Sequence, residues 1–296
     1  QRQMCIRDRS IPDPGMPLSD IFYPSMNQMT TFVSPRKIIF GAGSRGNLRE
    51  EIQSLGGSRP LIVTYPKTAS VANMAEVLRS LESDGMEIRV YEKAEPEPRV
   101  EVAEDLAGYT RAGKFDSIVG IGGGSVMDLA KIASMSVTNP GQIKDYLGFN
   151  LLRKKGAPLI CIPTTSGTGS EVTMFSVLTV GSKKMDVASH YILPDVALVD
   201  PVLTVTMPPK LTAGTGMDAL SQAVETVTSL AATPLTDSLA LKAIQLVRNS
   251  LKVVYANGDN LKARSEMALA ATLSGLAFGS GKLTLGHSLA QTFGPL

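Results

Sequence analysis

The segment best suited to bind a ligand is a run of three glycines between an apolar stretch and an amphipathic one. Gly122, Gly123 and Gly124 follow the predicted strand at 117–121, and Ser125 begins a stretch with helical spacing. Glycines let the backbone approach a ligand closely, and the first turn of a helix offers free N–H groups to a phosphate. We predict a phosphate-binding turn with Ser125 as the helix N-cap. A tight turn that needs glycine for packing alone is the alternative.

A second candidate segment is rich in hydroxyl groups. Thr164, Thr165, Thr168 and Ser170 lie directly after the apolar residues 159–162. Ligands of open α/β sheets bind beyond the carboxyl ends of the strands, so we expect these hydroxyls beside the glycine turn. The alternative is a hydroxyl-rich turn that caps a helix.

Two helical stretches contain residues that could bind a divalent cation. Asp218 and Gln222 are four residues apart, and His287 and Gln291 repeat that spacing. Residues at this spacing project from one face of a helix, and oxygen and imidazole groups from different helices can meet around a metal. Spacing alone leaves a purely structural role open, because single Asp and His residues on helices are more often structural.

These segments require a parallel sheet and helices to position them. Up to residue 208, short apolar runs alternate with amphipathic stretches, which is typical of a doubly wound α/β domain. We expect strands at 37–40, 61–65, 88–93, 117–121, 159–162 and 196–199, and helices at 47–55, 69–83, 100–112 and 125–136. Beyond Pro208 and Pro209 only helices are expected, at 215–229, 236–256 and 260–277.

Composition and charge exclude several classes of protein. The chain has 296 residues, 43% of them hydrophobic, and a net charge of +2 without a basic block. Nucleic-acid binding is not indicated, and no apolar run reaches the roughly 18 residues that span a membrane. Residues 278–282 lack the leading glycine of a P-loop, which disfavours ATP chemistry. Cys5 and Cys161 form no CxxC pair, so we expect a reduced, cytoplasmic protein.

Taken together, the motifs resemble the iron-containing, group III alcohol dehydrogenases. The resemblance rests on GGGSVMDLAK, PTTSGTGSEVT, PDVALVDP, MPPKLTAGTGMDAL and SGLAFGSGKLTLGHSLAQTFG, which occur in the family's order and spacing. It implies a Rossmann-like dinucleotide-binding α/β domain followed by an all-helical domain. We expect a partly artefactual tail at 1–30, the α/β domain at 31–207, and a helical domain at 208–296 that is truncated at its end.

The resemblance also implies the site residues and the reaction. NAD or NADP would contact Gly123, Gly124, Ser125, Asp128, Thr164, Thr165, Thr168, Val177, Lys184 and Tyr65. Asp218, Gln222 and His287 would bind Fe²⁺ or Zn²⁺, and Phe278 would wall the pocket, so that Asp218, His287 and Phe278 form the catalytic group. The metal would polarise the oxygen of a small alcohol or aldehyde while hydride passes to or from the nicotinamide. A homodimer is the family expectation.

Several positions depart from the family pattern. Gln222 stands where a histidine ligand is usual, and an amide oxygen binds iron or zinc less well than imidazole does. Gln291 replaces another histidine and cannot titrate. A further histidine ligand would lie beyond Leu296. Two alternatives therefore stay open: a metal-independent reductase similar to maleylacetate reductases, and a nucleotide-binding protein without catalysis.

One departure concerns the choice of cofactor. Tyr65 aligns with an acidic residue that would bind the ribose hydroxyls and repel a 2′-phosphate. Without that carboxylate NADP becomes possible, with assistance from Lys67. The alternative is that Tyr65 simply stacks near the adenine.

Overall fold

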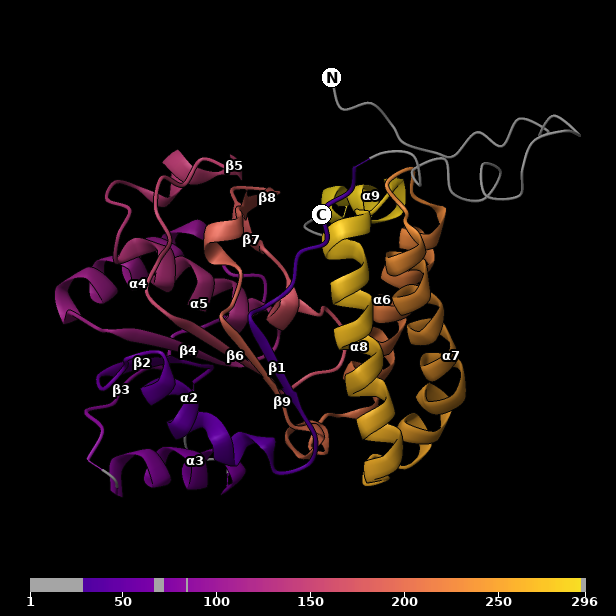
Figure 1. The fold of residues 1–296 in the computed structure, drawn as a ribbon, viewed down its shortest axis with the longest axis horizontal. Coiled ribbons are helices and arrows are strands. Elements are labelled where there is room, and N and C mark those ends of the chain that lie inside the picture. Colours follow the sequence, from indigo (N-terminus) through magenta and orange to yellow (C-terminus); the bar gives the residue numbers. More distant parts are fainter. Residues whose placement is uncertain (1–28, 67–71, 84, 294–296) are drawn as a thin grey trace, which may run out of the picture.

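The computed structural model describes residues 29–66, 72–83 and 85–293. Its sheet has six parallel strands in the order β1-β9-β6-β4-β2-β3 and stands beside a bundle of long helices (Figure 1). The strands are β1 (Lys37–Phe40), β2 (Pro60–Val63), β3 (Arg89–Tyr91), β4 (Ser117–Gly122), β6 (Leu159–Pro163) and β9 (Val196–Val199). The predicted class, a parallel α/β sheet followed by helices, is confirmed.

Helices cover both faces of this sheet. They are α2 (Leu48–Ser54), α3 (Ala72–Ser83), α4 (Val100–Gly113) and α5 (Gly124–Ser136). In β4, Ile118 packs in one core with residues of α4 and α5, and Val119 packs in the other with residues of α2 and α3. A strand that is buried on both faces reads as a continuous apolar run, which is why β2, β4, β6 and β9 were recognisable from the sequence.

The order of the strands defines a crevice at the carboxyl edge of the sheet. The connection after β2 leads to β3 on one side, whereas the connection after β4 leads to β6 on the other. The two neighbouring strands β2 and β4 therefore form a topological switch point. Ligands of open α/β sheets bind outside the carboxyl ends of the strands at such a point.

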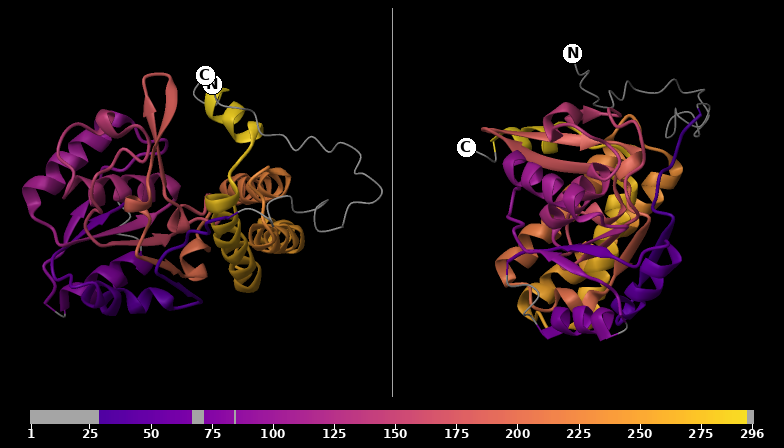
Figure 2. Two further views of the ribbon diagram at one scale, coloured as in Figure 1. Left: turned by 45° about the horizontal axis from the view of Figure 1, so that its top comes forward. Right: turned by 90° about the vertical axis from the view of Figure 1, so that its left-hand side faces the viewer.

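A small second sheet was not predicted. It contains β5 (Gly148–Phe149), β7 (Phe175–Val180) and β8 (Lys183–Ala188), in the order β5-β8-β7. β7 and β8 form a hairpin whose turn contains Gly181 at φ +61°, a conformation that glycine adopts easily. The polar start of β8 hid this strand from an apolar-run search. The hairpin rises beside the last helix (Figure 2).

The helical body consists of α6 (Pro209–Thr228), α7 (Pro234–Ala256), α8 (Leu261–Gly281) and α9 (Leu285–Phe293). α6 begins six residues before the predicted start at 215, because proline is well suited to the first turn of a helix. Buried Arg264 donates hydrogen bonds from α8 to the carbonyl groups of Val205 and Met207, and so fixes the chain where it enters the bundle.

The start of the helix predicted at 69–83 lies outside the described residues, and α3 is described from Ala72. In the described part of the chain, no helix has the length and apolar character to cross a membrane. The division into separate domains at residue 207 stays a prediction.

The sheet and the helical body meet at the turn after β6. Gly169, at φ +62°, lies against α8 so closely that a Cβ on Gly169 would be 2.6 Å from the Cα of Gly275. A Cβ on Gly275 would in turn lie 2.7 Å from the carbonyl oxygen of Gly169. A Cβ on Gly167 would be 2.6 Å from Thr215 of α6. Backbone therefore packs directly on backbone at this junction.

The first prediction tests this contact. Gly275→Ala should destabilise the chain by about 1–3 kcal/mol, because the added methyl group meets backbone that cannot move aside. The control is Gly279→Ala on the same helix, where the nearest atom to a new Cβ is 4.0 Å away. It should stabilise by about 0.5–1 kcal/mol, since alanine favours a helix over glycine. Urea unfolding measures both, and equal effects would contradict the close approach.

Candidate functional site

The glycine turn opens directly into α5. The helix begins at Gly124, and its N-cap is Gly123 in an extended conformation, with no side chain capping the first turn. The prediction that Ser125 is the N-cap is wrong, because the backbone already turns helical one residue earlier. The Ser125 hydroxyl instead accepts a hydrogen bond from the Glu97 N–H at 3.2 Å. An N-terminus without a capping side chain suits a phosphate.

Three predicted cofactor residues surround this turn. A Cβ on Gly124 would lie 2.8 Å from the Thr168 methyl carbon, and one on Gly123 would lie 3.4 Å from the Thr165 hydroxyl and 3.6 Å from the Tyr65 hydroxyl. Burial raises the pKa of Tyr65, and a hydrogen bond with Ser125 partly opposes this. Thr164 donates its N–H to the Gly122 carbonyl at 2.9 Å. The ends of β2, β4 and β6 thus converge on one place.

Asp128 faces the chain after the hydroxyl turn. Its carboxylate accepts hydrogen bonds from the Ser170 hydroxyl at 2.8 Å and from the Val177 N–H at 3.1 Å. Asp128 therefore holds the start of β7 in place, which differs from the predicted contact with the cofactor. Whether Asp128 and Val177 also reach a cofactor stays a prediction.

Lys131, which the sequence analysis did not single out, completes this clamp. Its buried ammonium donates to the Ser170 hydroxyl at 2.7 Å and to the Phe175 carbonyl at 2.6 Å. Burial lowers the pKa of Lys131 and raises the pKa of Asp128, and their mutual attraction opposes both shifts. A lysine on the apolar side of a predicted helix was the signal that could have revealed it.

A chain of contacts joins the glycine turn to a polar cavity. The N–H group of Glu97 donates to Ser125, and the carboxylate of Glu97 forms an ion pair with Lys184. The Lys184 Nζ lies 2.7 Å from the Glu97 Oε1. Lys184 lines a cavity of about 470 Å³ together with Asp218, Glu225 and His287. The cavity lies between the β7–β8 hairpin and helices α6 and α9, so that both bodies contribute to it.

An acid–histidine cluster lies in this cavity. His287 Nε2 is 3.3 Å from Asp218 Oδ1, and His287 Nδ1 is 2.6 Å from Glu225 Oε1. Burial alone would lower the pKa of His287, but the hydrogen bonds with both carboxylates raise it above its usual value. Burial would raise the pKa of Glu225, and the hydrogen bonds from His287 and Thr284 lower it. The sequence analysis missed Glu225, although it lies seven residues after Asp218 on the same helical face.

Gln222 does not join this cluster. It is 4% exposed, and its amide oxygen accepts a hydrogen bond from Ser274 of α8 at 3.3 Å. Asp218 and His287 fit part of the donor set of a divalent cation. Among the described residues, no three His, Cys, Asp or Glu side chains form a group that could hold one. The side chain of Gln291 lies outside the description.

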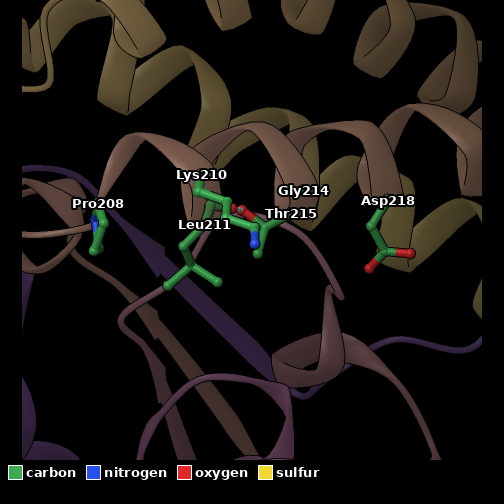
Figure 3. A pocket seen from close by; sticks show the side chains of 6 residues that line it. All are labelled: Pro208, Lys210, Leu211, Gly214, Thr215 and Asp218. Atoms are coloured by element: carbon green, nitrogen blue, oxygen red, sulfur yellow. Dashed lines mark hydrogen bonds between the residues drawn. The ribbon is translucent and has the colours of Figure 1, made fainter. Parts of the chain in front are cut away.

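A second cavity shares Asp218. It has about 590 Å³ and is lined by Pro208, Lys210, Leu211, Gly214, Thr215 and Asp218, from the start of α6 (Figure 3). Phe278 stacks on Phe175 with 6.4 Å between the ring centres and is 8% exposed. Phe278 is not among the described residues that line either cavity, so its role as a pocket wall stays a prediction.

The fold and the site define a class of two-part α/β proteins, in which a doubly wound sheet and a helical bundle meet around one polar cavity. Sequence profiles narrow this class. The profile described as iron-containing alcohol dehydrogenase matches residues 35–201, and the profile of the C-terminal region of the Fe-containing alcohol dehydrogenase family matches residues 212–295. The chain belongs to the iron-containing alcohol dehydrogenase family, as its motifs predicted.

Individual relatives agree with this assignment. Long-chain-alcohol dehydrogenase 1 of Geobacillus thermodenitrificans is 44% identical over 257 residues, which are 86% of this chain and 65% of the relative. The chain thus spans less than two thirds of that protein. An alcohol dehydrogenase from Oenococcus oeni superposes with a TM-score of 0.85 at 37% identity, covering 88% of this chain and 70% of the other. A sulfoacetaldehyde reductase from Bifidobacterium kashiwanohense, solved in complex with NAD⁺, superposes with a TM-score of 0.81 at 35% identity. The match covers 88% of this chain and 70% of the reductase.

The second prediction follows from the pKa shifts of the cluster. Because the pKa of His287 is raised in the folded protein, His287 stabilises the fold fully at pH values below its unfolded-state pKa of about 6.5. This stabilisation is lost as the pH rises through its folded-state pKa. Because the pKa of Glu225 is lowered in the folded protein, Glu225 stabilises the fold fully at pH values above its unfolded-state pKa of about 4.3. This stabilisation is lost as the pH falls through its folded-state pKa. The cluster therefore contributes most between these two pH values.

His287→Asn should accordingly lower the free energy of unfolding by about 1.5–3 kcal/mol at about pH 5.5, which is the range for hydrogen bonds to charged groups. At about pH 8.5 the loss should be clearly smaller. Urea unfolding at both pH values measures this. His190→Asn is the control, because His190 is exposed and is the other of the two histidines. A cost of H287N that is the same at both pH values would contradict the assignment.

Proposed function

We propose that this protein is an NAD(P)-dependent alcohol dehydrogenase or aldehyde reductase. The observation that carries the proposal is the chain of contacts from Ser125 through Glu97 and Lys184 to the cavity with Asp218 and His287. It links a glycine turn suited to phosphate with a cluster suited to a substrate oxygen, and hydride transfer requires that cofactor and substrate bind next to each other.

The cofactor binds at the switch point of the sheet in this proposal. The N–H groups at the start of α5 receive the pyrophosphate, and the hydroxyls of Thr165 and Thr168 line the path toward the cavity. Lys184, which pairs with Glu97, connects the start of α5 with the cavity along this path. The NAD⁺ complex of the Bifidobacterium kashiwanohense reductase supports this class of cofactor. Tyr65, which carries no negative charge at neutral pH, leaves NADP as a second cofactor.

The substrate is a small alcohol or aldehyde, in keeping with the names of the relatives. Asp218 and His287 would hold a divalent ion, iron or zinc, which when bound polarises the substrate oxygen as a Lewis acid. The cavity beside the start of α6, lined by Pro208 and Leu211 among others, has room for the carbon chain of the substrate. The homodimer and the cytoplasmic location expected from the sequence are part of this proposal.

A metal-independent reductase is the second candidate, and the position of Gln222 favours it. The amide oxygen of Gln222 is engaged with Ser274 between α6 and α8 rather than with the cavity. A cation would therefore receive fewer protein ligands than in relatives with a histidine there, and hydrogen bonds in the pocket would polarise the carbonyl.

The third prediction tests the cofactor turn. Gly124→Ala should raise the Kd of NADH about tenfold, because the new methyl group displaces Thr168 and narrows the approach to the helix N-terminus. Gly108→Ala in α4 is the control, since a Cβ there meets nothing within 4 Å. Fluorescence titration with NADH measures both, and unchanged binding in Gly124→Ala would move the cofactor away from this turn.

The fourth prediction separates the two candidate functions. Oxidation of NADH and NADPH is followed with a panel of small aldehydes, before and after chelation, together with metal content. If a metal acts, the purified protein contains iron or zinc, and chelation abolishes turnover. Turnover that survives chelation would support the metal-independent reductase. Absence of turnover with bound NADH would overturn both.

A further inference from the structure

The side chain of Glu225 lies at the N-terminus of α9. Its Oε2 accepts hydrogen bonds from the Thr284 N–H at 2.8 Å, from the Thr284 hydroxyl at 2.8 Å, and from the His287 N–H at 3.4 Å. A carboxylate at this position satisfies free N–H groups and interacts favourably with the positive end of the helix. Gly286 makes room for it, because a Cβ there would lie 2.7 Å from Glu225 Oε1. One oxygen of Glu225 thus serves as the cap of α9.

The other oxygen has a different partner. Glu225 Oε1 lies 2.6 Å from Nδ1 of the His287 ring, whose Nε2 faces Asp218 and the cavity. An ionised carboxylate only accepts hydrogen bonds, so each carboxylate favours a hydrogen on the ring nitrogen that it faces. The contact of Nδ1 with Glu225, at 2.6 Å, is much shorter than the contact of Nε2 with Asp218, at 3.3 Å, so the single hydrogen of the neutral ring belongs on Nδ1. In the neutral ring, Nε2 then keeps its lone pair. The cap alone would not need this contact, because Oε2 already accepts hydrogen bonds from three donors at the start of the helix.

We propose that Glu225 is a positioning residue, which fixes His287 in the Nδ1–H tautomer and presents Nε2 to the cavity while it caps α9. Carboxylates that hold a ligand histidine through its second nitrogen set both its tautomer and its orientation. Because the same carboxylate caps α9 and bonds the His287 ring, the position of α9 and the orientation of the ring depend on each other. The inference rests on the proposed function for the importance of Nε2, but the tautomer itself can be measured without cofactor or substrate.

The fifth prediction is a spectroscopic one. The chain has two histidines, so ¹⁵N spectra of the imidazole rings contain two sets of signals. In the metal-free full chain, at a pH where titration shows the rings to be neutral, His287 should be in the Nδ1–H form. His287→Asn assigns its signals. A wild-type ring in the Nε2–H form would overturn the inference, whether or not the protein turns over an aldehyde.

Glu225→Gln gives the sharpest contrast. The single amide oxygen of the glutamine will face the three donors at the start of α9, so that its NH₂ group faces the ring and forces Nδ1 to accept a hydrogen bond. We expect a preserved fold, a switch of His287 to the Nε2–H form, and a zinc affinity reduced about 10- to 100-fold in calorimetric titration of the metal-free protein. An unchanged tautomer in E225Q would overturn the inference.

Thr284→Val is the matched control. It removes the hydroxyl that donates to Glu225 Oε2 and leaves the carboxylate and its contact with the ring in place. It should loosen α9, seen as faster amide exchange in that helix, and keep the Nδ1–H form and the zinc affinity. A change of tautomer in T284V equal to that in E225Q would show that the ring follows the helix alone. If wild-type protein keeps the tautomer but binds no zinc, the metal-dependent function fails and the positioning role stands.

Discussion

The arrangement of the whole site depends on one close contact of backbone with backbone, between Gly169 and Gly275. This contact lets the turn after β6 touch α8 without side chains between them. The hydroxyls of that turn face the glycine turn at the start of α5, while the opposite side of the turn lies against the helical bundle. The distance between the glycine turn at the sheet edge and the cavity on α6 is therefore set by packing, and interiors packed at this density do not deform gradually.

Buried charges stabilise the same junction. Lys131 and Asp128 hold the segment from Ser170 to the start of β7, and Glu171 in that segment accepts a hydrogen bond from Thr272 of α8 at 2.8 Å. Each of these groups is costly to bury, and removal of one partner would leave the other uncompensated. The network thus ties α5, the β7–β8 hairpin and α8 to a single relative placement.

The cavity shows how positioning is divided between the two bodies. The hairpin supplies Lys184, and the helical body supplies Asp218, Glu225 and His287. Glu225 neutralises the end of α9 and orients the ring with separate oxygens, so that the short last helix and its histidine are placed together. Gln222, four residues from Asp218, turns instead into the contact of α6 with α8. Its side chain contributes to packing there and not to the cavity.

The sequence alone determined the class of fold, the family, and the elements whose apolar runs are continuous, such as β4 and β9. It also located the glycine turn, because three glycines directly after an apolar run mark the end of a buried strand. It could not determine the N-cap at Gly123, the β7–β8 hairpin, or the partners of His287. These depend on groups far apart in the chain: Glu225 and His287 are 62 residues apart, and Glu97 and Lys184 are 87 apart. Local periodicity reports which face of an element is buried, whereas only the packed structure decides which side chains meet across it.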